Sequence, residues 1–150
     1  MAGKTYWQQD KTLSLLTSNV LAAGTPLTYV NLFTANPASD NNATGGTLGT
    51  EWTGNGTDRI RVYSTVQVSN PYWVGPLSES NKRYLTNVNE ISWTYTQAGA
   101  QQIVVGIGVW DSDTSGTGNL RYWEPLDTTR TIVTGQEFVL PTYGLKVRED

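Results

Sequence analysis

The amino-acid sequence contains no cysteine and no histidine among its 150 residues. The two absences exclude thiol nucleophiles, Cys/His zinc sites, His-based catalytic triads and imidazole pH switches. Most common enzyme mechanisms depend on one of these groups. We therefore expect a protein that is not an enzyme and that has no catalytic residue, no cofactor-binding residue and no metal ligand.

Charged side chains are also scarce. They make up 15% of the residues, with 10 basic and 13 acidic side chains and a net charge of −3. This fraction is about half of that on a well-solvated monomer surface, so we expect much of the surface to contact other protein. No run of Lys and Arg provides the positive patch that nucleic acid requires. We expect no nucleic-acid partner.

Long apolar runs are missing as well. No segment is long enough for a signal peptide or a membrane span. We therefore expect a chain that is made in a cytoplasm, stays soluble there and has no membrane partner.

The chain length matches one compact domain, so we predict a single domain over residues 1–150. Near its start, Leu13, Leu16 and Val20 recur at spacings of three and four, which predicts a short N-terminal helix at about residues 10–22. Gly24 and Pro26 would end this helix.

The rest of the sequence is typical of strands. Segments rich in β-branched and aromatic residues alternate with turn residues, and the segment 103–110 is the most apolar, so we expect it to be a central strand. The predicted strands are 26–34, 59–68, 88–96, 103–110, 120–123, 130–133, 137–140 and 143–147. Short strands at this spacing predict a mainly β protein, an antiparallel β-sandwich of the jelly-roll type.

Two segments are predicted as loops. Residues 38–58 are rich in Asn, Thr and Gly, with Glu51 and Trp52 as the only bulky pair. Such a segment has too little apolar area to offset its ordering entropy, so we expect a neighbouring subunit to order it. The second loop is expected from Asn70 to Arg83, because Pro71 and the pair Gly75-Pro76 interrupt it.

The order of strands and turn glycines resembles a known family. The features are a short helix, the strand Leu27–Ala35, the Arg-Ile-Arg-Val strand at 59–62, an Ile-Ser-Trp strand ending at Trp93, the run 105–111, and the elements 131–138 and 144–147. Together they resemble small structural proteins of tailed bacteriophages, regarded either as capsid decoration (cement) proteins or as tail-associated proteins.

The resemblance implies a virion protein that forms oligomers. The expected function is a cement subunit on the outer surface of the capsid, with the major capsid protein as its partner and a homotrimer as its assembly state. The alternative is a tail or tail-fibre component that binds a receptor glycan. Copy number separates the two, because a head protein is present in hundreds of copies per particle and a tail protein in far fewer.

Six tryptophans and eight tyrosines are present, and their positions indicate different roles. Trp93 and Trp110 fall within predicted strands and are expected in the core. Aromatic rings in polar segments more often anchor protein interfaces. The predicted interface residues are Tyr6, Trp7, Trp52, Tyr72 and Trp73.

Three further patterns have an ordinary structural explanation. Glycoside hydrolysis needs only two acidic side chains, and Glu51, Glu79, Glu90, Asp111 and Glu124 are candidates, but such pairs arise by chance. The segment 111–116 imitates the start of a calcium loop, although Tyr122 stands where the bidentate glutamate belongs, so we expect a turn. Gly106 and Gly108 lie in mid-strand, which favours close packing over phosphate binding.

Overall fold

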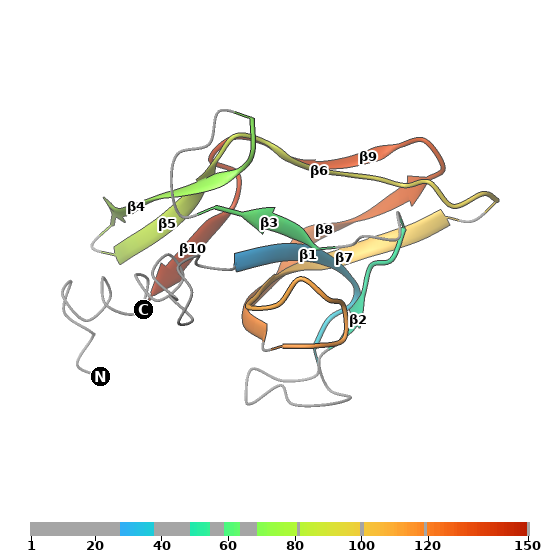
Figure 1. Ribbon diagram of the computed structural model, residues 1–150, viewed down its shortest axis with the longest axis horizontal. Coiled ribbons are helices and arrows are strands. Elements are labelled where there is room, and N and C mark those ends of the chain that lie inside the picture. Colours follow the sequence, from blue (N-terminus) through green and yellow to red (C-terminus); the bar gives the residue numbers. More distant parts are fainter. Residues whose placement is uncertain are drawn as a thin grey trace. The chain divides into compact units, whose positions relative to one another are not determined.

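The computed structural model describes residues 28–37, 49–54, 59–63, 69–80, 82–99, 101–118 and 120–149 (Figure 1). Within these residues the secondary structure is entirely β. The strands are β1 (Thr28–Ala35), β2 (Thr50–Glu51), β3 (Ile60–Val62), β4 (Tyr72–Glu79), β5 (Lys82–Val88), β6 (Ile91–Thr94), β7 (Gln101–Trp110), β8 (Leu120–Val133), β9 (Glu137–Leu140) and β10 (Lys146–Glu149).

The mainly β, antiparallel fold class is confirmed, because the two larger sheets are built from antiparallel pairs. The predicted helix at about residues 10–22 lies outside the described residues. Among the residues that are described, no helix is long and apolar enough to cross a membrane. The jelly-roll-like packing of the sheets stays a prediction.

The described residues fall into two compact units. Unit 2 takes in Tyr29–Arg61 and Ser92–Val139, and unit 1 takes in Thr28, the segment Val62–Ile91 and the chain from Leu140 onward. Each unit is thus built from separate stretches of the chain. The prediction of a single domain over residues 1–150 is not tested by this division and stays a prediction.

Unit 2 is built on a sheet in which β7 is the central strand. Its order is β2-β1-β7-β8, and β3 also pairs with β1 (Figure 1). The register places Tyr29 opposite Trp110 and Leu32 opposite Ile107. The predicted strand at 26–34 is confirmed over its described part, which is the buried strand β1, and the predicted central strand at 103–110 is confirmed as β7.

Aromatic rings fill the core of unit 2. Phe33 lies 6.0 Å from Trp110, and Trp52 lies 6.1 Å from Tyr95, measured between ring centroids. Trp93 is fully buried and Trp110 is 1% exposed, so their prediction as core residues is confirmed. These wide rings fit because the neighbouring strand carries glycine: a Cβ atom on Gly108 would lie 2.7 Å from a ring carbon of Phe33.

The segment 38–58 is predicted to be a loop, and in its described part residues 49 and 52–54 lie outside strands whereas a short strand interrupts them. Residues 50 and 51 form β2, and the Trp52 amide donates a hydrogen bond of 2.9 Å to the Leu32 carbonyl. The polar composition is misleading here because two residues of the segment make buried contacts. The Trp52 indole is fully buried, and Glu51 forms a buried ion pair with Arg59. Residues 38–48 and 55–58 lie outside the described residues.

Unit 1 contains a three-stranded sheet with the order β10-β5-β4. Leu85 at its centre is fully buried, and Trp73 and Val147 are each 4% exposed. The predicted loop from residue 70 to residue 83 is therefore wrong, because most of it is β4 and the start of β5. The ladder shifts register between Val74 and Leu77, at the Gly75-Pro76 pair, and β4 tolerates this proline because it is an edge strand.

One predicted strand is divided in the structure. The segment 88–96 contains the end of β5 and all of β6, with Asn89 between them at φ 64°. Asparagine accepts this left-handed conformation more readily than most residues, and it turns the chain here. The buried Asn87 side chain holds the turn, donating 2.8 Å to the Asn89 carbonyl and 3.0 Å to the Pro141 carbonyl, and accepting 2.9 Å from the Leu145 amide.

Candidate functional site

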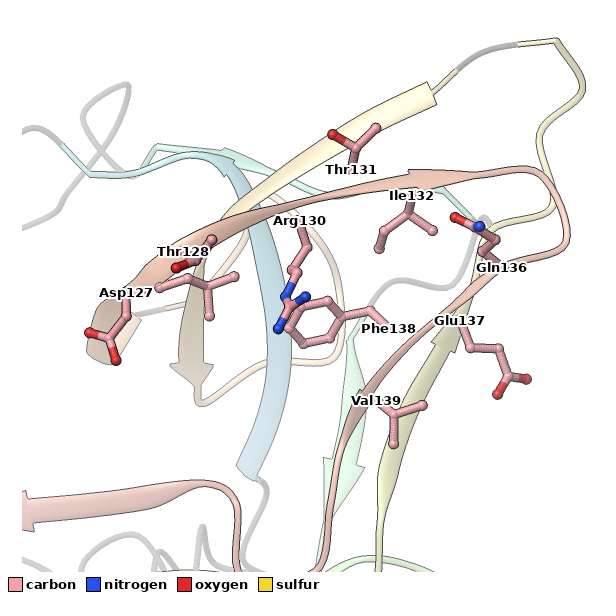
Figure 2. A pocket seen from close by; sticks show the side chains of 10 residues that line it. Asp127, Thr128, Arg130, Thr131, Ile132, Gln136, Glu137, Phe138 and Val139 are labelled. Carbon is pink, nitrogen blue, oxygen red and sulfur yellow. The ribbon is translucent and has the colours of Figure 1, made fainter.

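A pocket of about 740 Å³ lies in unit 2, between β8 and β9 (Figure 2). Its polar lining residues are Asp127, Thr128, Arg130, Thr131, Gln136 and Glu137. Its apolar lining residues are Leu126, Ile132, Phe138 and Val139. The volume falls in the range of about 300–1,000 Å³ that is usual for small-ligand sites.

A large bulge in β8, four residues opposite one, lies beside this pocket. Val104 lies opposite Arg130 and Gly106 lies opposite Pro125. The ladder therefore has the four residues 126–129 of β8 where β7 has the single residue Val105. A bulge bends its strand and redirects the side chains that it carries. The sequence predicted two strands, at 120–123 and 130–133, and the structure joins them into one strand with this bulge in the predicted gap.

Beyond the bulge, β8 resumes its alternation and points every second side chain at the pocket. In Figure 2, Arg130 and Ile132 extend to the side of β8 that faces β9, and Thr131 extends to the opposite side. Phe138 reaches from β9 into the same space. Its ring is held edge-on against Trp93, with centroids 6.1 Å apart and planes inclined by 65°. The aromatic ring in the pocket therefore contacts a buried ring of the core.

The polar side chains of the pocket differ in whether they already have a hydrogen-bond partner. Glu137 accepts a hydrogen bond of 3.1 Å from the Thr94 hydroxyl, and Gln136 accepts one of 3.2 Å from the Val133 amide. The side chains of Arg130 and Asp127 make no hydrogen bond or ion pair with any other described residue. The pocket thus offers one guanidinium and one carboxylate to a ligand.

A second polar cluster lies in unit 2, and it is buried. The Arg59 guanidinium donates to both Glu51 carboxylate oxygens, from Nε at 2.9 Å and from Nη2 at 2.7 Å. Its Nη1 donates to the carbonyls of Ser112 and Thr117 at 2.7 and 2.9 Å. The guanidinium carbon also lies 3.9 Å from the centre of the Trp110 ring, a cation–π geometry. Arg59 therefore ties β2 to the turn after β7.

The Glu51 carboxylate in this cluster is saturated with donors. Besides Arg59, it accepts 2.9 Å from the Asn31 amide nitrogen and 3.0 Å from the Gly116 amide. Burial of the carboxyl raises its pKa, but the hydrogen bonds from Arg59, Asn31 and Gly116 outweigh that effect and hold the pKa of Glu51 below its usual value. A carboxylate that stays ionised and fully bonded is suited to holding structure, and not to general acid catalysis.

The comparison with protein families matches this chain over residues 3–148 to the family described as Podophage GP4 fiber I protein gp80. The chain belongs to this family. It is accordingly a member of a family of tailed-phage virion structural proteins, which confirms the resemblance drawn from the strand order. No curated protein matches the sequence.

For this member of the fibre I family, the predicted interface residues fall into three groups. Tyr6 and Trp7 lie outside the described residues. Trp52 is fully buried and Trp73 is 4% exposed, so both indoles pack inside their own chain and not on its surface. Tyr72 is half-buried on β4. Polar sequence neighbours made Trp52 and Trp73 look like surface anchors. The structure instead places the Trp52 ring against Tyr95 and pairs Trp73 with Asn87 of β5.

Two further acidic candidates of the sequence are bound by basic side chains. Asp111 is bound by Arg121 at 2.6 Å, and Glu79 is bound by Lys146 at 3.0 Å and by Arg148. The hydrogen bond from Lys146 is the main reason why the pKa of Glu79 is lowered. Glu90 and Glu124 are exposed on the surface.

The calcium-like segment 111–116 is a turn, and the positive charge beside it is the Arg59 guanidinium of the same chain. The carbonyls of Ser112 and Thr117 accept from Arg59, and the Ser112 and Thr117 hydroxyls lie 2.9 Å apart. In the part of the chain that the structure describes, no three acidic side chains lie close enough to hold a metal ion.

The residues that line the pocket were not predicted as a site. A proline at position 125, inside an otherwise strand-like segment, is the one signal in the sequence that marks the irregular part of β8.

Proposed function

We propose that the chain is a subunit of a phage tail fibre and that it takes part in binding a receptor glycan. The family match over residues 3–148 carries this proposal, because it covers almost the whole chain and names a fibre protein. It favours the tail-fibre alternative over capsid decoration.

Two features of the surface support a role in assembly. Only 15% of the residues are charged. Ile103 and Val133 are 48% and 40% exposed, and the register of β7 and β8 places them on one face of the sheet at diagonal positions. Exposed apolar side chains on one face are typical of surfaces that meet other protein. We keep the homotrimer as the proposed assembly state and the jelly-roll-like β-sandwich as the proposed packing of the sheets.

The position and copy number of the chain in a reconstruction of the intact particle test this proposal. We expect a few to some tens of copies on the tail. Hundreds of copies on the outer capsid surface, in contact with the major capsid protein, would instead establish the cement function. The mass of the purified protein in solution tests the trimer.

We also propose that the protein is not an enzyme and needs no cofactor. The bonding of Glu51, Asp111 and Glu79 to basic side chains supports this, since each of these carboxylates is held in an ion pair. Purified protein should therefore leave polysaccharides intact. Cleavage that is lost on Glu51→Gln or Glu90→Gln, in a variant that is still folded at the assay temperature, would instead identify a glycosidase.

A further inference from the structure

We propose that the pocket between β8 and β9 binds a neutral saccharide, with Arg130 and Asp127 as its polar contacts and Phe138 as its apolar contact. This inference rests on the glycan-binding part of the proposed function and gives it a site and a ligand class.

The polar contacts follow from the two charged groups without partners. Arg130 presents a planar fork of N–H donors and Asp127 presents a carboxylate that only accepts. Neither is bound to another described residue, so neither has to give up an existing partner when a ligand arrives. Sugar hydroxyls can accept from such a guanidinium and donate to such a carboxylate. A ligand rich in hydroxyls therefore offers partners for both kinds of group.

The apolar contact follows from the ring on β9. Phe138 is half-buried and reaches into the pocket from the strand opposite Arg130 (Figure 2). Because the ring already packs edge-on against Trp93, it loses little freedom when a ligand covers it. A pyranose ring has an apolar face of C–H groups as well as its hydroxyls, which matches a pocket with four apolar and six polar lining residues.

The charge of the pocket decides between neutral and acidic sugars. Asp127 and Glu137 are two carboxylates against the single guanidinium of Arg130. A ligand with its own carboxylate would meet this excess of negative charge, and repulsion of this kind is a common source of specificity. The proposal therefore commits to a neutral saccharide.

Binding to the full-length protein tests the site. The probes are the methyl glycosides of glucose, galactose, mannose and rhamnose, together with maltose and lactose, and glucuronic and galacturonic acid serve as the acidic counterparts. We expect ligand-observed NMR to detect at least one neutral probe and two-dimensional NMR to show shifts of the Phe138 ring signals. Arg130→Ala and Asp127→Asn should each weaken this binding at least about tenfold, the loss expected for a hydrogen bond to a charged group.

Matched control variants lie on the same strand. Arg121→Ala removes an arginine of β8 that does not line the pocket, and Glu124→Gln neutralises an exposed carboxylate three positions before Asp127. Both controls should bind the probe as the wild type does. All four variants should keep the wild-type melting temperature, because each changes an exposed side chain.

The outcomes separate this inference from the proposed function. If a neutral probe binds but the pocket variants bind it equally well, the pocket is the wrong site and the fibre function stands. If only the acidic probes bind, the ligand class is wrong. If no saccharide binds the wild type, both this inference and the glycan-binding part of the proposed function are overturned, while the position in the particle still decides the fibre function.

Discussion

Replacing Glu51 by glutamine removes the charge that compensates Arg59 inside unit 2. The Arg59 side chain is fully buried and the Glu51 side chain is 8% exposed. Glutamine keeps one acceptor oxygen but turns an NH₂ group towards donors that need an acceptor. Removing one partner of a buried ion pair costs about 3–5 kcal/mol. For a chain of this size, about 2–4 °C is lost per kcal/mol, so we expect the melting temperature to fall by about 10 °C.

The assay is thermal and urea unfolding of the purified chain, with Glu90→Gln as the matched control. Glu90 is exposed, so the same substitution there should change the free energy of unfolding by less than about 0.5 kcal/mol. A double-mutant cycle with Arg59→Met measures the coupling directly, and we expect the two substitutions to be strongly non-additive. Additive effects, or a Glu51→Gln variant as stable as the Glu90→Gln variant, would refute this account of the cluster.

The pH dependence supplies a second measurement on the same variant. The pKa of Glu51 is lowered in the folded chain, so the ionised carboxylate contributes stability above the pKa of an unfolded glutamate, about 4.3. This contribution is lost as the pH falls below that value and through the lower folded pKa. The difference in stability between wild type and Glu51→Gln should therefore be largest near neutral pH and should shrink below about pH 4.3. A difference that stays constant down to pH 2 would contradict the role of the charge.

Three further substitutions test other parts of the structure. Trp52→Ala should lower the free energy of unfolding of the isolated chain by about 3–5 kcal/mol, because the indole is fully buried. An unchanged melting temperature would contradict this core role and favour the role of Trp52 as an interface residue. Asn87→Ala removes three hydrogen bonds and should lower the free energy of unfolding by about 3 kcal/mol. Hydrogen exchange of the Leu145 amide should become faster, and unchanged exchange would contradict the role of the Asn87 side chain. Gly108→Ala places a Cβ atom 2.7 Å from the Phe33 ring and should cost about 1–3 kcal/mol by overpacking, which equilibrium unfolding in urea will measure.

The sequence predicted the strands whose side chains carry their own signal. β1 and β7 are long runs of apolar and β-branched residues, and such runs are buried in almost any arrangement of a β protein. β4 was missed because Gly75 and Pro76 are turn residues in most contexts, and only the edge position of the strand makes them acceptable. The edge position is a property of the sheet and not of the segment.

The functional residues were harder to predict for a similar reason. Arg59 binds carbonyl groups 53 and 58 positions further along the chain, and no local pattern indicates such contacts. The pocket depends on four residues of β8 that face one residue of β7, and the composition of those four residues is ordinary for a loop. Trp52 was assigned to the surface because its neighbours are polar, although its partner Tyr95 is supplied by the segment after β6.

The path of the chain through the two units constrains how the gene can vary. Unit 2 is left after Arg61, entered again at Ser92 and left after Val139. A single recombination junction in the coding sequence therefore cannot exchange unit 2, with its pocket, for another version of the same unit. An exchanged gene segment that covers unit 2 would also carry the codons for residues 62–91, which encode part of unit 1. Changes in the lining of the pocket are accordingly expected to arise by point substitutions in β8 and β9, while the two units are inherited together.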